Sequence, residues 1–234
     1  MVFKFFVFFI SLSFGISQSS IAADKSLFRP MQRSWDILMN SSIFHDADVG
    51  NKFGFELTVS QQEILFNDAS YTLGEHRISS FRMRSLRTSI NLPIYLQIGV
   101  NLTLPTYTVY NFDTSLNGYF VKFQFNQWLF EWFPKMAIQF DRNSVTLGDF
   151  FESSSSSMNF HLSAKLSKFN LYAGYIYSSN KSTFKLDSGE LSDTRVEVYP
   201  RVGLNFNFLL FSLYGETTFV DGFKHFSAGL SLRF

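Results

Sequence analysis

Short segments in which apolar and polar residues alternate recur through most of this chain, and this period of two constrains the fold more than any other feature. The clearest segment is IYLQIGVNLTL, at residues 94–104, where an aliphatic residue occupies every second position. Because successive side chains of a β-strand point to opposite faces, each such segment predicts a strand with one apolar face. After residue 23, no stretch is apolar enough to predict a spanning helix.

The alternation predicts about ten strands, within a range of about 8–12. Most runs hold about 9–11 residues, which is the length that a tilted membrane strand needs, whereas strands of soluble proteins centre nearer to about 5–6 residues. The predicted strands are 52–60, 76–90, 94–104, 116–126, 135–146, 156–166, 169–178, 195–206, 211–219 and 224–234.

The links between these strands also differ in a regular way. Short links at 92–93, 167–168 and 207–210 alternate with longer polar links at 61–75, 105–115, 147–155 and 179–194. In membrane barrels, short periplasmic turns alternate along the chain with longer extracellular loops. The sequence therefore predicts an all-β fold, a transmembrane antiparallel up-and-down barrel, with residues 52–234 as the barrel domain.

The first 23 residues have the features of a secretory signal peptide. Lys4 gives a positive start, an apolar run follows, and Ser20-Ile21-Ala22 supplies small residues before a cleavage point after Ala22 or Ala23. The apolar run is too short to span a bilayer, which needs about 20 residues. We expect residues 1–23 to be removed on export.

The last ten residues, HFSAGLSLRF, alternate up to the final phenylalanine. A terminal aromatic residue behind an alternating strand resembles the C-terminal signal of Gram-negative outer-membrane β-barrel proteins. The resemblance covers the chain from about residue 52 at the level of architecture. It implies a location in the bacterial outer membrane and recognition of the last strand by the barrel assembly machinery. The residues that carry it are Phe226, Ala228, Leu230, Leu232 and Phe234.

Cysteine is absent and the charge is balanced. Without cysteine there is no disulfide framework, and a closed barrel would supply stability instead, because its strands pair every backbone polar group. Loss of Lys4 with the signal peptide lowers the formal net charge from +1 to 0. A neutral chain gives no electrostatic reason to expect nucleic acid as a partner. We expect a monomer in contact with outer-membrane lipid and lipopolysaccharide.

Residues 24–51 do not alternate and form a separate N-terminal extension. Trp35, Leu38, Met39 and Ser42 lie near helical spacing, and Ser34 is placed to cap such a helix. The extension could plug the barrel and gate a ligand path, or it could be a periplasmic leader that packs to cover the tryptophan. An extra strand is a third alternative.

Charged residues of both signs fall on the polar faces of the predicted strands. Barrels of about eight strands are just wide enough for side chains to fill them, and open channels belong to much larger barrels. We therefore expect a largely filled lumen with ion pairs and hydrogen bonds. The candidate lumen and ligand residues are Glu56, Lys122, Asp141, Arg195, Glu197, Arg201 and Glu216, with His161, Lys165, His225 and Arg233 as further lumen positions.

Two constellations are weak candidates for chemistry. His161 and Ser163 share one face of a strand, and such a pair resembles the lipid A deacylases of the outer membrane, but the next strand offers no acidic partner. His45, Asp46 and Asp48 are possible ligands of a divalent ion with too few companions. The sequence predicts neither a metal site nor a cofactor.

The polar stretches FESSSSSMN, at 151–159, and SSNKSTFKLDSGELSDT, at 178–194, predict flexible extracellular loops that could bind a surface partner. The preferred function is non-enzymatic: a structural or surface-interaction barrel, or a narrow conduit for a small or lipidic ligand. A lipid-modifying enzyme is the alternative.

Overall fold

The computed structural model describes most of the chain. The described residues are 25–41, 47–49, 51–66, 71–73, 76–78, 80–104, 108–109, 112–126, 133–186, 189–220 and 223–234. The predicted signal peptide lies outside them. The chain divides into two compact units after Pro30, and the barrel belongs to the second unit, Met31–Phe234. In the described part of the chain, no helix combines the length and the apolarity that a bilayer crossing requires.

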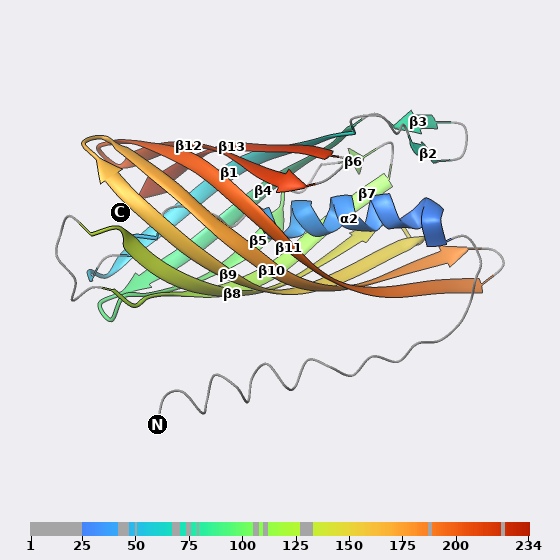
Figure 1. Ribbon diagram of the computed structural model, residues 1–234, viewed down its shortest axis with the longest axis horizontal. Helices are drawn as coiled ribbons and strands as arrows, with labels where there is room; N and C mark the ends of the chain where they lie inside the picture. Colours follow the sequence, from blue (N-terminus) through green and yellow to red (C-terminus); the bar gives the residue numbers. More distant parts are fainter. Residues whose placement is uncertain are drawn as a thin grey trace, which may run out of the picture. The chain divides into compact units, whose positions relative to one another are not determined.

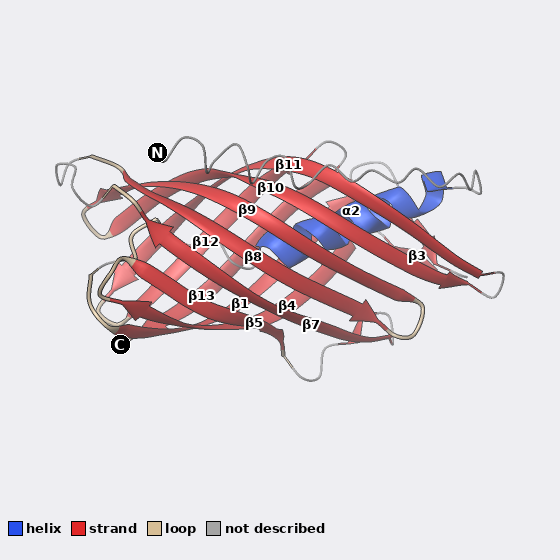
Figure 2. Cartoon of the chain, turned by 90° about the horizontal axis from the view of Figure 1, so that it is seen from below, coloured by secondary structure: helices blue, strands red, loops and turns tan. Residues whose placement is uncertain are grey.

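Among the described residues, ten antiparallel strands form a closed barrel (Figures 1 and 2). Neighbouring barrel strands pair in chain order, β5 pairs with β7, and β1 pairs with β13 to close the ring. The barrel strands are β1 (Gly54–Phe66), β4 (Ser80–Leu92), β5 (Leu96–Thr103), β7 (Phe112–Gln124), β8 (Lys135–Leu147), β9 (Phe151–Leu166), β10 (Phe169–Leu186), β11 (Gly189–Phe208), β12 (Phe211–Val220) and β13 (Phe223–Arg233). Three short strands, β2 (Tyr71–Leu73), β3 (His76–Ile78) and β6 (Thr108–Val109), lie in the links.

The apolar face of the wall points outward. In β5, the side chains of Ile98 and Val100 are 44% and 39% exposed, whereas Gln97, which directly precedes Ile98, is buried. The same alternation runs along β1, β9 and β10, with large aliphatic and aromatic residues outside and serine, asparagine, glutamine and charged residues inside. A soluble barrel would have its apolar side chains inside and its polar side chains outside. The outward apolar face is therefore typical of a barrel surrounded by lipid.

The two ends of the barrel differ. At one end, here the turn end, lie the turns 93–95, 167–168 and 209–210 and the C-terminal Phe234. Each of these turns contains one non-glycine residue in the left-handed region, with φ of 58° at Tyr95, 60° at Ser167 and 52° at Leu209. The opposite end, here the extended end, is where β9, β10 and β11 reach furthest, over 16, 18 and 20 residues.

The ten predicted strands are confirmed, and the largest errors are the lengths of four of them. Residues 61–66, predicted as part of a link, belong to β1. Residues 153–157 are part of β9, and residues 179–186 and 189–194 belong to β10 and β11. The prediction of two flexible loops at 151–159 and 178–194 is therefore wrong. Both faces of these segments are polar, so hydrophobic alternation gives no signal there, although the backbone pairing continues without a break from Leu166 to Phe151 along β10.

Three glycines make room for aromatic rings inside the barrel. Gly99, Gly203 and Gly229 lie directly across from Phe120, Tyr172 and Tyr214 in the neighbouring strand. A Cβ atom on any of the three would lie within 2.5 Å of the facing ring. Each ring therefore lies over a glycine, a pairing known as aromatic rescue, and the rings fill lumen space that open water would otherwise occupy.

The C-terminal residue closes the ring. The amide of Phe234 donates to the carbonyl of Phe55 over 2.9 Å, and the amide of Phe55 donates to the carbonyl of Phe234 over 3.0 Å. The side chains of Phe226, Leu230 and Phe234 face outward and are exposed, and Leu232 is partly exposed. Recognition of these side chains by an assembly machinery stays a prediction.

Candidate functional site

The candidate site is the lumen of the extended end, which is occupied by residues 31–41 of the helix α2 (Lys25–Ser41) (Figures 1 and 2). From Gln32 to Asn40 every side chain is buried except the half-buried Arg33. A surface helix would bury one face alone, so burial on all sides shows that the barrel wall surrounds this part of the helix. The observed helix begins earlier than the sequence predicted. Ser34 therefore lies inside the helix and does not cap it.

The apolar side of α2 packs against aromatic rings of the wall. Trp35 is fully buried, with its ring centroid 5.5 Å from that of Phe81 on β4 and 6.2 Å from that of Phe151 on β9. Phe184 of β10 extends this cluster, 4.7 Å from Phe151. Burial of side chains of this size stabilises the docked helix through the hydrophobic effect, by about 1.5–3 kcal/mol for each large apolar residue.

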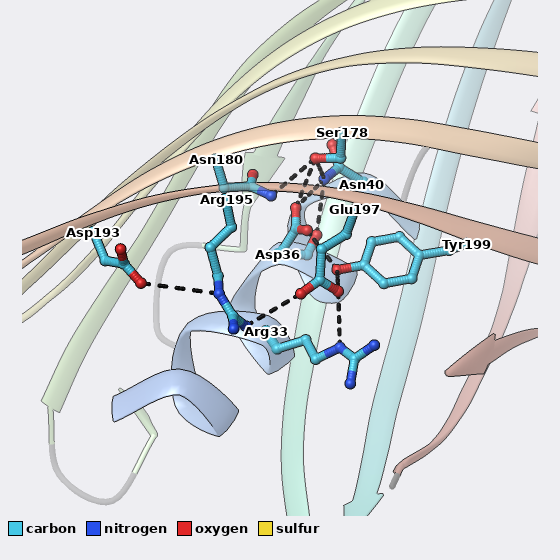
Figure 3. Close-up of polar contacts among 9 residues, drawn as sticks. All are labelled: Arg33, Asp36, Asn40, Ser178, Asn180, Asp193, Arg195, Glu197 and Tyr199. Atoms are coloured by element: carbon cyan, nitrogen blue, oxygen red, sulfur yellow. Dashed lines mark hydrogen bonds and ion pairs between the residues drawn. The ribbon is translucent and has the colours of Figure 1, made fainter. Parts of the chain in front are cut away.

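The polar side of α2 is held by hydrogen bonds from three wall strands, of which Figure 3 shows the contacts with β10 and β11. Asp36 accepts from Ser178 of β10 over 2.9 Å and lies 2.7 Å from the hydroxyl of Tyr199 on β11. Asn40 donates to Ser155 of β9 and to Ser178, both over 3.0 Å. All five of these residues are buried, so these contacts replace the hydrogen bonds to water that the groups lose on docking.

A charged cluster lies nearer the extended end. Glu197 on β11 accepts from Arg33 of α2 over 2.8 Å and from Arg195 over 3.2 Å. Its Oε2 atom also lies 2.7 Å from the Tyr199 hydroxyl, and Arg195 reaches Asp193 at 3.9 Å (Figure 3). The predicted lumen residues Arg195 and Glu197 therefore lie side by side, and they bind the helix.

Burial raises the pKa of Asp36 to about 6, against an ordinary value of 3.8. Loss of hydration disfavours the charged carboxylate, and the negative charge of Glu197 adds to this effect. Hydrogen bonds from Tyr199 and Ser178 oppose the rise. Because α2 is not a strand of the wall, this titration reports on the docking of the helix inside the barrel.

The direction of the helix follows from its contacts with β11. Gln32 donates to the carbonyl of Asp193 over 3.3 Å, and the carbonyl of Asn40 accepts from Arg201 over 3.1 Å. Since β11 runs from the extended end toward the turn end, α2 runs the same way. Further along, the amide of Ala47 donates to Ser163 over 3.1 Å and that of Val49 to Gln124 over 3.0 Å. The described parts of residues 31–49 therefore follow the lumen toward the turn end.

A second layer of side chains lies in the turn half of the lumen. The guanidinium of Arg87 lies 3.8 Å above the centre of the Phe120 ring. Arg201 pairs with Glu216 at 3.5 Å, and Glu216 accepts from Tyr172 over 3.2 Å. These side chains are buried, and opposite charges at this depth are stable only when paired and hydrogen bonded.

The remaining predicted lumen residues, apart from Lys165, also lie inside the wall. Glu56 accepts from Gln97 over 3.1 Å and from Ser231 over 2.7 Å, and it pairs with Arg233 at 3.5 Å. Asp141 accepts from Gln139, Ser157 and Asn159. Lys122 and His225 are buried, and Lys165 is exposed. The structure places these residues in separate groups along the wall and does not gather them into one pocket.

His161 and Ser163 both point into the lumen, where His161 is fully buried and Ser163 is nearly so. The Ser163 hydroxyl accepts the amide of Ala47, so it holds the N-terminal segment. A reaction on a bilayer lipid would need both groups at the outer surface. Asp48 is exposed, and His45 and Asp46 lie outside the described residues. Within the described part of the chain, no three histidine, aspartate or glutamate side chains are placed to share a metal ion.

The residues that sequence reasoning missed are those that bind the helix: Asp36, Asn40, Ser155, Ser178 and Tyr199. Asp36 and Tyr199 are 163 positions apart, so no local pattern connects them. One signal was available. Residues 153–157 are all serine, and the small side chains of Ser153, Ser155 and Ser157 on the inner face of β9 leave space for a helix.

Comparison with known proteins gives likenesses of fold. No family model matches the chain, and no curated protein matches it. Among solved structures, it is similar to the translocator domain of the autotransporter NalP from Neisseria meningitidis, with 10% identity, a TM-score of 0.40, and 91% of this chain and 99% of that chain covered. It is similar to Ail, the attachment invasion locus protein of Yersinia pestis, with 14% identity, a TM-score of 0.33, and 79% and 99% covered.

A loop-deletion mutant of OmpT, an outer-membrane protein of Vibrio cholerae, is also similar, with 13% identity and a TM-score of 0.34. That match covers 65% of this chain and 54% of the other, so this chain spans about half of its length. These neighbours are bacterial outer-membrane β-barrels. At such low identities and TM-scores, no activity transfers to this chain.

Proposed function

We propose that this chain is an integral protein of a bacterial outer membrane whose barrel is closed by its own N-terminal helix, and that it has a structural or surface-interaction role. The observation that carries the proposal is the docking of α2. Its apolar side packs on Phe81 and Phe151, and its polar side binds β9, β10 and β11. A segment held by so many buried contacts belongs to the folded state.

The outward belt of apolar residues supports a membrane location. Along β5 and β9 the outward side chains are apolar and exposed, from Ile98 to Leu102 and from Met158 to Leu162, as in the lipid-facing band of outer-membrane barrels. The short turns and Phe234 mark the end that faces the periplasm in barrels with an even number of strands. On this basis the extended end faces the cell exterior, and the polar outer faces of β9, β10 and β11 are the surface available to a partner.

Two obstructions in series support a closed lumen. The first is α2 in the extended half. The second is the layer of Arg87, Phe120, Tyr172, Tyr214, Arg201 and Glu216 in the turn half, in which three rings lie over glycines. This arrangement favours the structural and surface roles over the conduit. A lipid-modifying enzyme is disfavoured because His161 and Ser163 face the lumen.

The remaining expectations are part of this proposal. Residues 1–23 direct export, the strand that ends at Phe234 is read by the barrel assembly machinery, and the mature protein is a monomer in contact with outer-membrane lipid. The exposed outer faces of Phe226, Leu230 and Phe234 support access of that machinery to the last strand.

Single-channel recording tests the closed lumen. The refolded chain from residue 24 is inserted into planar bilayers beside a variant that lacks 25–49, with a heat-modifiability gel to confirm that each is folded. We expect silence from the intact chain. Steps of conductance from the intact chain would overturn the closed barrel. A variant that conducts would identify α2 as the main seal, and a silent variant would assign the seal to the turn-half layer as well.

A further inference from the structure

The outer wall carries a groove in the middle of its apolar belt. It crosses the wall from β9 through β10, β11, β12 and β13 to β1, and its volume is about 970 Å³. Its lining is almost entirely apolar. The outward side chains at its centre are those of Ala173, Val202, Leu204, Phe226 and Ala228.

Small residues explain the depth of the groove. Gly215 of β12 pairs directly with Ala228 of β13, and Ala173 of β10 pairs with Val202 of β11. A Cβ atom added at Gly215 would meet nothing within 4 Å, so the wall at this position is open. Between Leu204 and Phe226, the surface is therefore hollowed by the absence of side chains, in a region that faces lipid.

The groove ends at a group of charged residues on β1, β4 and β13. Gln61 and Glu63 line this end, where the apolar face of β1 gives way to polar residues. Glu63 accepts from Arg82 over 2.8 Å, and Gln61 accepts from Arg84 over 3.1 Å. Lys224 lies two residues before Phe226, on the same face of β13. Three cationic side chains thus stand beside one carboxylate, at the border of the belt on the side of the extended end.

We propose that this groove and its basic end bind a phosphate-bearing glycolipid of the outer leaflet, with acyl chains in the groove and a phosphate at Arg82, Arg84 and Lys224. Charge complementarity supports this occupant. Guanidinium groups bind phosphate through paired hydrogen bonds, and Arg82 is 60% exposed and can turn toward a headgroup. A cationic cluster at the border of the hydrocarbon layer is stabilised by an anionic headgroup, which plain acyl chains cannot provide.

The inference rests on the membrane location in the proposed function and is independent of the closed lumen. The groove is on the outer face of the wall, and its lining includes none of the residues that bind α2. Tyr172 and Glu216 border it at strand positions whose side chains point into the lumen. A failure to bind lipid would leave the conductance result unchanged, and a conducting barrel would leave the lipid site unchanged. The two proposals can therefore fail separately.

Lipid retention by the folded full chain in detergent, measured by native mass spectrometry, tests the site. The probes are hexa-acylated lipid A with two phosphates, the same lipid A after removal of both phosphates, phosphatidylglycerol and inorganic phosphate. The test variants are Arg82→Gln/Arg84→Gln, which removes two cations, and Gly215→Phe, which fills the groove. The matched controls are Arg142→Gln, an exposed arginine on β8, and Val59→Phe, on the outer face of β1 outside the groove.

We expect the unmodified chain to retain bisphosphorylated lipid A. We expect both test variants to retain it at least tenfold less, and the two controls to stay within twofold of the unmodified chain. Equal retention by all variants would overturn the site. Equal retention of the phosphate-free lipid or of phosphatidylglycerol would overturn the proposed headgroup. Displacement by inorganic phosphate alone would show a free-anion site, and a dimer mass sensitive to Gly215→Phe would show that a second copy occupies the groove.

Discussion

The hydroxyl of Tyr199 lies 2.7 Å from the Oδ2 atom of Asp36 and 2.7 Å from the Oε2 atom of Glu197. A hydroxyl has one proton to donate, so it can satisfy only one of the two carboxylates at a time. A proton on Asp36 supplies the second hydrogen bond, because Asp36 can then donate to the tyrosine oxygen. This three-residue contact joins the lumen helix to β11 and makes its strength dependent on pH.

Docking of α2 is expected to weaken as the pH rises from about 4 to about 6. The pKa of Asp36 is about 6 in the docked state and 3.8 when free, so the docked form binds the proton more tightly. The contribution is complete below the lower value and is lost above the upper value, a change of about 3 kcal/mol. Urea unfolding of the barrel in lipid vesicles, from pH 4 to pH 8, measures it.

Asp36→Asn is the control for this pH dependence. The amide keeps the shape of the side chain but has no titration in this range, whereas Glu197, Arg33 and Arg195 remain. We expect the difference in stability between the two proteins to vary with pH only between about pH 4 and pH 6. A constant difference across the whole range would contradict the role of Asp36.

Trp35→Ala is expected to lower the stability of the folded barrel by about 3–5 kcal/mol, because it empties a fully buried site between Phe81 and Phe151. Trp35→Phe keeps a ring in that site, and we expect it to lose less than half as much. Unfolding monitored by circular dichroism compares the three proteins. Equal stability of the alanine variant and the unmodified chain would show that the helix adds little to the folded barrel.

Gly203→Val tests the rings that lie over glycines. A Cβ atom at Gly203 would lie 2.2 Å from the Tyr172 ring, so we expect overpacking to cost about 1–3 kcal/mol. Tyr172→Ala in the same chain should recover part of this loss, since it removes the clash. Gly215→Ala, on the outer face with nothing within 4 Å, is the matched control and should fold normally. A Gly203→Val variant as stable as the unmodified chain would contradict the packing of the Tyr172 ring over Gly203.

Ile98→Arg tests the outward face. Ile98 is 44% exposed on β5, between Ile90 and Val121 of the neighbouring strands. Near the bilayer midplane, an arginine here should cost about 2–4 kcal/mol in lipid. Ile98→Ala removes the apolar side chain without adding charge, so the difference between the two variants isolates the cost of the charge. Equal losses from both would argue that Ile98 does not face the hydrocarbon layer.

The wall of the barrel could be predicted from sequence because one face of each strand is consistently apolar. In β5 and β12 the predicted and observed strands agree to within about two residues, since the turns at 93–95 and 209–210 break the alternation sharply. The extended end could not be predicted in the same way. Around Ser155 and Ser178, both faces are polar, and the strand is specified by pairing and by contact with α2 instead.

The site was less predictable than the wall. The spacing of Trp35, Leu38 and Met39 predicted a helix, and the polar faces predicted Arg201, Glu216 and Glu197 as lumen residues. The wall partners of the helix could not be predicted, because each of its hydrogen bonds to β9, β10 and β11 joins residues more than 100 positions apart, such as Asn40 and Ser155, which are separated by 115. Only the closed register of ten strands brings these residues to the same level of the lumen.

Disulfide cross-linking tests the central claim, that the helix is docked inside the barrel, most directly. The chain has no cysteine, so the double variant Asn40→Cys/Ser178→Cys carries the only two thiols. In the native chain, Asn40 Nδ2 and Ser178 Oγ lie 3.0 Å apart. The control is the double variant Asn40→Cys/Ser179→Cys, in which the second thiol points outward. We predict complete cross-linking of the first pair, with the helix retained in the barrel after proteolysis of the chain between residues 41 and 54. Free thiols in the first pair, or equal cross-linking in the control, would contradict a helix docked in the lumen.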